Sequence, residues 1–121
     1  MTMQYMMLIY HDENSPLRPA EGSQLMQQYM REFMMFTEDI VKSGHFKASN
    51  RLESATRATT VRVRDGKTVT IDGPFAETKE QLGGYYLVEA KDLDEALAIA
   101  QRIPAARHGS VEVRPIIQMN R

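Results

Sequence analysis

The chain of 121 residues has no cysteine and no tryptophan, and its uninterrupted hydrophobic runs are short. Without cysteine it cannot contain a disulfide scaffold, a thiolate zinc site or a cysteine nucleophile. The apolar run near the N-terminus spans about six residues and has no basic flank, which is too short for a signal peptide or a membrane span. We therefore expect a soluble, cytoplasmic protein.

An excess of charge of one sign is also missing. Fifteen Lys and Arg residues balance sixteen Asp and Glu residues, for a net charge of −1. A basic surface of the kind that binds nucleic acid or anionic lipid is thereby excluded. At one domain per roughly 100–200 residues, residues 1–121 form a single domain.

Hydrophobic periodicity predicts two helices and several strands. Apolar residues at three- and four-residue steps predict a first helix of about 22–25 residues, beginning near Pro19 and ending at Gly44. Asp92 and Glu95 have the spacing of a helix cap, and the second helix carries an inward stripe from Leu93 to Ile103 before Pro104. The predicted strands are 3–10, 45–51, 82–90 and 111–117, with a hairpin over 59–71.

Three local features refine this pattern. Residues 3–10 are apolar on both faces of the strand, so both faces require cover. In the hairpin we favour a three-residue turn, Arg64-Asp65-Gly66, which pairs Val61 with Val69 and keeps one face apolar. Thr78 and Gln81 have the spacing of a capping box, which predicts a short helical turn.

The order of elements predicts an α+β fold: a ferredoxin-like plait in which two helices lie on one face of an antiparallel sheet. Two helices cover only one face, so we expect the other face to meet a second copy in a symmetric homodimer. Eight of the nine methionines lie within the first 35 residues. Methionine is a pliable core residue and can also provide an adaptable pocket lining.

Two stretches of the chain resemble a known family. The run from Asp72 to Tyr86, DGPFAETKEQLGGYY, and the run from Ile103 to Pro115, IPAARHGSVEVRP, closely resemble the YCII-related family and specifically its DGPF branch. The resemblance implies a dimeric α+β barrel with a cleft between sheet and helices. It assigns no activity to this branch, whose members are often encoded beside sigma factors of the extracytoplasmic-function type. Compact YCII proteins are proposed to pair a first-helix histidine with an aspartate, and this chain has no histidine between His11 and His45.

Two residues are catalytic candidates. Asp72 is the aspartate of the DGPF turn, where a carboxylate can act as a general base if burial raises its pKa. The alternative is that Asp72 only fixes the turn by accepting backbone N–H groups. His11 stands at the end of the first strand, and its alternative is an ordinary loop histidine.

Four further residues are candidates for binding a substrate. Arg51 can clamp a carboxylate, or it forms an ion pair with Glu53. Lys79 can hold an anion with Glu77 beside it, or both belong to a solvated charged turn. Tyr85 can provide an aromatic wall, or it packs in the core; Tyr86 points to the opposite face of the strand.

The sequence contains no glycine-rich phosphate loop, no nucleophile elbow and no histidine spacing typical of metal ligands, so we expect no cofactor. Two hypotheses for function stay open. The first is a small-molecule-binding domain, with acid/base isomerisation or elimination of an acidic organic compound as its chemistry. The second is a non-catalytic regulatory protein that associates with a sigma factor.

Overall fold

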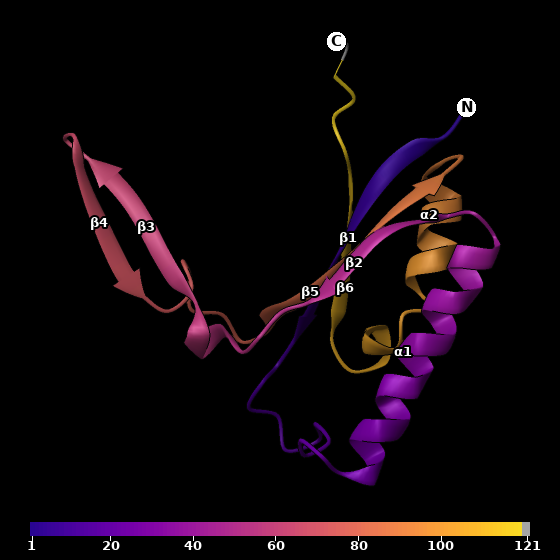
Figure 1. The fold of residues 1–121 in the computed structure, drawn as a ribbon, viewed down its shortest axis with the longest axis horizontal. Coiled ribbons are helices and arrows are strands. Elements are labelled where there is room, and N and C mark those ends of the chain that lie inside the picture. The colour runs from indigo at the N-terminus through magenta and orange to yellow at the C-terminus, as the bar shows by residue number, and fades with distance from the viewer. Residues whose placement is uncertain (120–121) are drawn as a thin grey trace.

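A computed structural model of the chain describes residues 1–119 (Figure 1). Six strands and two helices follow one another, together with two short 3₁₀ turns. The strands are β1 (Met3–His11), β2 (Phe46–Arg51), β3 (Thr59–Arg64), β4 (Lys67–Asp72), β5 (Gln81–Ala90) and β6 (Ser110–Pro115). The helices are α1 (Gln24–Lys42) and α2 (Leu93–Ala100), and the 3₁₀ turns are η1 (Ala55–Arg57) and η2 (Pro104–Arg107).

Four strands form one antiparallel sheet in the order β2-β5-β1-β6. Both helices lie on the same side of this sheet, as Figure 1 shows. The α+β class and the ferredoxin-like arrangement expected from the sequence are therefore confirmed. Within the described residues, neither helix is long and apolar enough to cross a bilayer.

The core lies between the sheet and the helices. Tyr5, Met7 and Ile9 alternate along β1 toward the helices and are buried, and α1 packs Phe36 and Ile40 onto them. The intervening side chains of β1 point to the other face of the sheet, where they are only half-buried. Helices thus cover one face of an apolar strand and leave the second face uncovered.

The ends of both helices are set by local hydrogen bonds. α1 begins at Gln24, because the Ser23 side chain accepts from Met26 N at 3.1 Å, so the predicted start near Pro19 is wrong. The predicted end is confirmed, since Gly44 follows the helix with a φ of +84°. Asp92 caps α2 through Glu95 N at 2.9 Å, as predicted.

The inward stripe of α2 differs from the prediction. Ala96, Ile99 and Ala100 are buried, whereas Leu93 and Leu97 are exposed. The helix ends at Ala100, so only two turns face the sheet, and small side chains allow it to pack closely.

The hairpin β3–β4 has a different register from the one we favoured. Asp65 and Gly66 form a two-residue turn with φ values of +52° and +74°, which pairs Val63 with Thr68 and Val61 with Thr70. Asp-Gly suits this type I′ turn, whose twist matches that of the strands, and this local preference outweighs the apolar pattern. The hairpin stands away from the sheet on the side opposite the helices (Figure 1).

The predicted helical turn at Thr78 is also wrong. The Thr78 hydroxyl donates to the Glu80 carbonyl, and the Gln81 side chain donates to the Thr78 carbonyl at 2.6 Å. These bonds hold an irregular loop, and Gln81 is already the first residue of β5.

Candidate functional site

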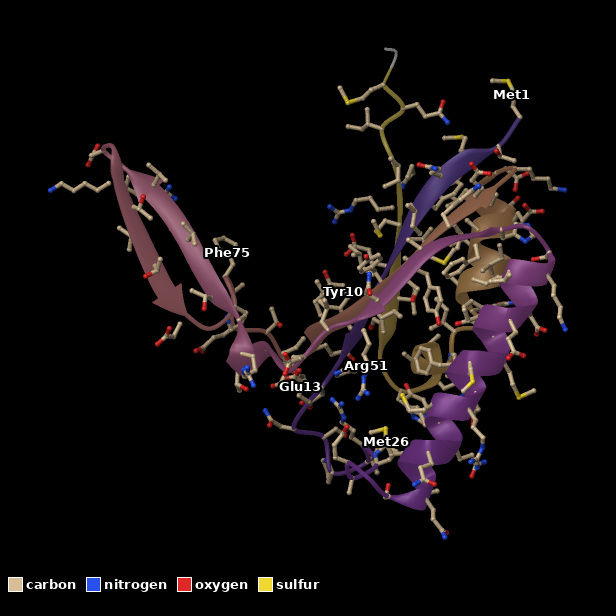
Figure 2. All side chains as sticks on the ribbon, in the orientation of Figure 1. Met1, Tyr10, Glu13, Met26, Arg51 and Phe75 are labelled. Carbon is tan, nitrogen blue, oxygen red and sulfur yellow. The ribbon has the colours of Figure 1, made fainter. Side chains whose placement is uncertain are left out.

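A cavity of about 390 Å³ lies between α1 and the face of the sheet that the helices cover. Its inner wall is apolar and includes Ile9, Met26, Met30, Phe33 and Tyr86. Two of the residues that line it are labelled in Figure 2: Arg51 at the end of β2 and Met26 in the first turn of α1. A volume of this size suits a small organic molecule. Two of the clustered methionines therefore line a pocket, which fits the adaptable lining considered from the sequence.

The mouth of the cavity carries His11, Arg18 and Arg51. Arg18 donates from Nη1 to His11 Nε2 at 2.8 Å. Arginine has donors only, so Nε2 must be unprotonated and the proton of a neutral ring sits on Nδ1. Burial, followed by the charge of Arg18, lowers the pKa of His11. His11 is therefore a neutral imidazole near pH 7.

His11 occupies its place because the strand beside it has a glycine. Pairing between β1 and β5 shifts after Ile9, where Tyr10 faces Leu82 and Gly83 has no partner on β1. A Cβ atom at Gly83 would lie 2.3 Å from Cε1 and 2.9 Å from Nδ1 of the His11 ring. The Cε1 edge of the imidazole therefore lies against the backbone of β5, and only glycine leaves it this space.

A third arginine and a tyrosine extend the polar side of the cavity. Arg107 forms an ion pair with Glu32, and both Arg107 and Tyr29 line the cavity. The Tyr29 ring packs edge-on against Phe33 with a centroid distance of 5.1 Å. Burial raises the pKa of the Tyr29 hydroxyl, while the charges of Arg107 and Arg18 act in the opposite direction. Tyr29 is therefore a protonated hydroxyl close to the arginines.

Arg51 is held only loosely. Its Nη2 atom lies 3.6 Å from Glu21 Oε1, and both side chains are more than half exposed. The ion pair with Glu53 considered from the sequence does not form, because Glu53 pairs with Arg57 instead. An exposed pair at this distance contributes little stability, so Arg51 can exchange Glu21 for another carboxylate at little cost.

Three of the six residues singled out from the sequence lie at the cavity, but one of these three turns its ring away from it. His11, Arg51 and Tyr85 border the cavity. Tyr85 is paired with Leu8, which places its ring on the uncovered face, where its hydroxyl accepts from Asn50 Nδ2 at 2.8 Å. It is Tyr86 that lies under α1, with its hydroxyl 2.6 Å from Thr37 Oγ1.

The other three candidates lie elsewhere. Asp72 is the last residue of β4, at the base of the hairpin, and Glu77 and Lys79 lie in the loop that follows. All three are exposed, and none lines the cavity. The roles considered for them stay predictions. Among the residues that the structure describes, no three His, Asp or Glu side chains gather as metal ligands would.

Sequence reasoning missed Arg18, Tyr29, Gly83 and Arg107. The Gly83-Gly84 pair inside a strand was a usable signal, since glycine there commonly marks a bulge or a close approach. Arg18 carried no such signal, because it lies in the loop before α1 and reaches His11 only through the path of that loop.

Two comparisons with known proteins agree with this description. The YCII-related domain family matches residues 3–120. An uncharacterized protein of Rhizobium meliloti strain 1021 is 40% identical over 116 residues, which cover 94% of this chain and 92% of that protein. The chain belongs to the YCII-related family.

Proposed function

We propose that the cavity binds a small acidic organic compound and that His11 carries out acid/base chemistry on it. One observation supports this proposal above all: an apolar cavity opens onto Arg18, Arg51 and a neutral imidazole. Apolar walls with a few convergent polar groups at one end are typical of small-molecule sites. The cations favour a carboxylate at the mouth, because guanidinium and carboxylate match in geometry.

The contact between Arg18 and His11 suggests how a ligand prepares the base. In the empty site, the lone pair on His11 Nε2 accepts from Arg18. A carboxylate bound at the mouth competes for the same guanidinium, since a charged acceptor forms a stronger hydrogen bond than a neutral ring. Arg18 then turns to the ligand and leaves Nε2 free to take a proton.

The chemistry that follows is proton transfer next to an acid group. Nε2 takes the proton from the carbon adjacent to the carboxylate, and the electron pair moves onto oxygens held by Arg18 and Arg51. In a substrate with a β,γ double bond, the imidazolium returns the proton to the γ-carbon and the double bond shifts to the α,β position, which is an isomerisation. In a substrate with a leaving group on the β-carbon, the electron pair forms the α,β double bond and expels that group, which is an elimination. Tyr29 offers a protonated hydroxyl on the same side of the cavity.

Binding is tested by calorimetry with benzoate and its uncharged counterpart benzamide. We expect benzoate to bind at least about tenfold more tightly, and Arg51→Met to weaken benzoate about tenfold, as for the loss of one charge-assisted hydrogen bond. Arg31→Met is the matched control, since Arg31 is exposed on α1 and does not line the cavity. Equal affinities for the two probes, or equal effects of the two variants, would contradict the binding proposal.

Chemistry is tested separately from binding. Small carboxylic acids incubated with the protein in D₂O should take up deuterium at the carbon next to the acid group, as seen by NMR. His11→Gln should abolish this exchange while benzoate still binds. Exchange that persists in His11→Gln would exclude His11 as the base.

We also propose that the chain forms a homodimer through the uncovered face of the sheet. Met6, Leu8, Tyr10 and Leu87 point to this face and are half-buried. A contiguous apolar sheet face without helices is unusual for a monomer, and a second copy provides a surface of the same kind. Sedimentation velocity should give twice the mass of one chain, and a monomer at high concentration would contradict the proposal.

A further inference from the structure

The hairpin β3–β4 is exposed on all sides. Val61 and Val63 are 60% and 59% exposed, and Val69 and Ile71 are nearly half exposed. Phe75, just beyond the hairpin, is 75% exposed and lies beneath the Arg62 guanidinium at 5.1 Å. The two strands contact mainly each other. A two-stranded hairpin without further packing is marginally stable in water, so this arm needs a surface to lie against.

Apolar side chains occur on both faces of the arm, whereas its basic side chains lie on one face only and Asp72 lies at the base of the other. Directly opposed residues share a face, so Val61, Val63, Thr68 and Thr70 form one surface that is uncharged above its base. The basic side chains of the arm lie on the other surface; these are Arg62, Arg64 and Lys67. The uncharged surface can therefore be buried against a partner without leaving an unpaired charge in the interface.

The uncovered face of the sheet is compatible with such a contact. Its charged side chains are already paired, Arg114 with Glu112 and Lys47 with Glu89 at 3.4 Å. Figure 1 shows that the hairpin and this face both lie away from the helices. The hairpin and the uncovered face of the sheet therefore lie on the same side of one chain.

We propose that the hairpin of each copy packs against the other copy in the dimer, which makes it a clasp between subunits. This inference rests on the homodimer proposed above and adds the element that holds it together. In a dimer with two-fold symmetry, every contact occurs twice. If the hairpin of one copy packs against its partner, the hairpin of the partner therefore packs against the first copy in the same way.

The area agrees with the needs of a stable dimer. At about 3.3 Å per residue and about 4.8 Å between strands, the four-stranded sheet has a footprint of roughly 500 Å². One face of the hairpin adds roughly 200 Å² by the same measure. A specific interface buries about 800 Å² of accessible surface per partner, so the sheet face and the hairpin, with roughly 700 Å² of projected area together, reach the size that a stable dimer needs.

The test compares two double variants by sedimentation velocity. Val61→Glu with Val63→Glu places charges on the uncharged surface of the hairpin. Met35→Glu with Val41→Glu is the matched control, since Met35 and Val41 are exposed to a similar extent on α1. We expect the dimer dissociation constant to rise about 100-fold for the hairpin variant and to stay unchanged for the control.

Two further measurements separate docking from folding. Val61→Thr with Val63→Thr keeps the β-branched shape and should raise the dissociation constant in the same direction. Amide hydrogens of residues 59–72 should exchange more slowly above the dissociation constant than below it. A monomeric wild type would overturn both the dimer and the clasp. A wild-type dimer whose hairpin variants associate normally, with unprotected amides, would overturn the clasp alone.

Discussion

Replacement of Gly83 by alanine tests whether the site depends on the fit between His11 and β5. The added Cβ would lie 2.3 Å from His11 Cε1, whereas ordinary contact begins at 3.4 Å, so the ring must move by about 1 Å. Gly83 has no positive φ, so alanine strains no backbone angle. The expected damage is therefore confined to the ring and to its 2.8 Å bond with Arg18.

The expected loss of stability follows from the hydrogen bond between Arg18 and His11. A hydrogen bond to a charged group contributes about 1.5–3 kcal/mol, and partial exposure of this pair places the loss near the lower end. Alanine also restricts the conformations of the unfolded chain, and this stabilisation offsets about 0.4–1 kcal/mol of the lost hydrogen-bond energy. We therefore expect Gly83→Ala to reduce the free energy of unfolding by about 1 kcal/mol in urea titrations followed by circular dichroism.

The same substitution in a variant that lacks the His11 ring tests this explanation. When His11→Ala removes the ring, the added methyl meets no imidazole, and only the restriction of the unfolded chain remains. Gly83→Ala should then be neutral or stabilising by up to about 1 kcal/mol. An equal loss of stability in both backgrounds would show that the glycine serves the backbone and not the histidine.

Two further predictions concern pH. Burial and the charge of Arg18 lower the pKa of His11 in the folded protein, so the unfolded chain binds the proton more readily. The free energy of unfolding should therefore rise with pH between the lowered pKa and 6.5. In His11→Gln the thermal midpoint should not change with pH over this interval. The backbone N–H of Lys91, and after it His45, lower the pKa of Glu95 in the folded protein. The ionised Glu95 side chain therefore stabilises the fold at pH values above 4.5, and this stabilisation is lost as the pH falls through the lowered pKa. Glu95→Gln should lack that acid limb in urea titrations, and an unchanged limb would contradict this assignment.

Much of the fold was predictable because its signals are local. The Asp92 cap and the Gly44 stop were read correctly from residues within one helical turn. The errors arose where two local preferences competed. At the hairpin, the Asp65-Gly66 turn outweighed the pattern that would have aligned Val61 with Val69.

The candidate site was predictable only in part. His11 and Arg51 were identified at the ends of their strands, where a sheet presents residues to a cleft. Arg18 was missed, since its contact with His11 depends on the course of a loop between β1 and α1. Asp72 was favoured because of its motif, yet the hairpin carries it away from the cavity of its own chain.

The sequence by itself determined the class of fold, the order of elements and the two-sided apolar character of β1, because each depends on the periodicity of neighbouring residues. Only the tertiary structure decided which tyrosine lies under α1, which arginine bonds to His11 and where the hairpin stands. Those outcomes depend on contacts between distant segments, such as Gly83 against His11 across two strands. The spacing of residues along the chain does not predict such contacts, because they form between segments that only the folded chain brings together.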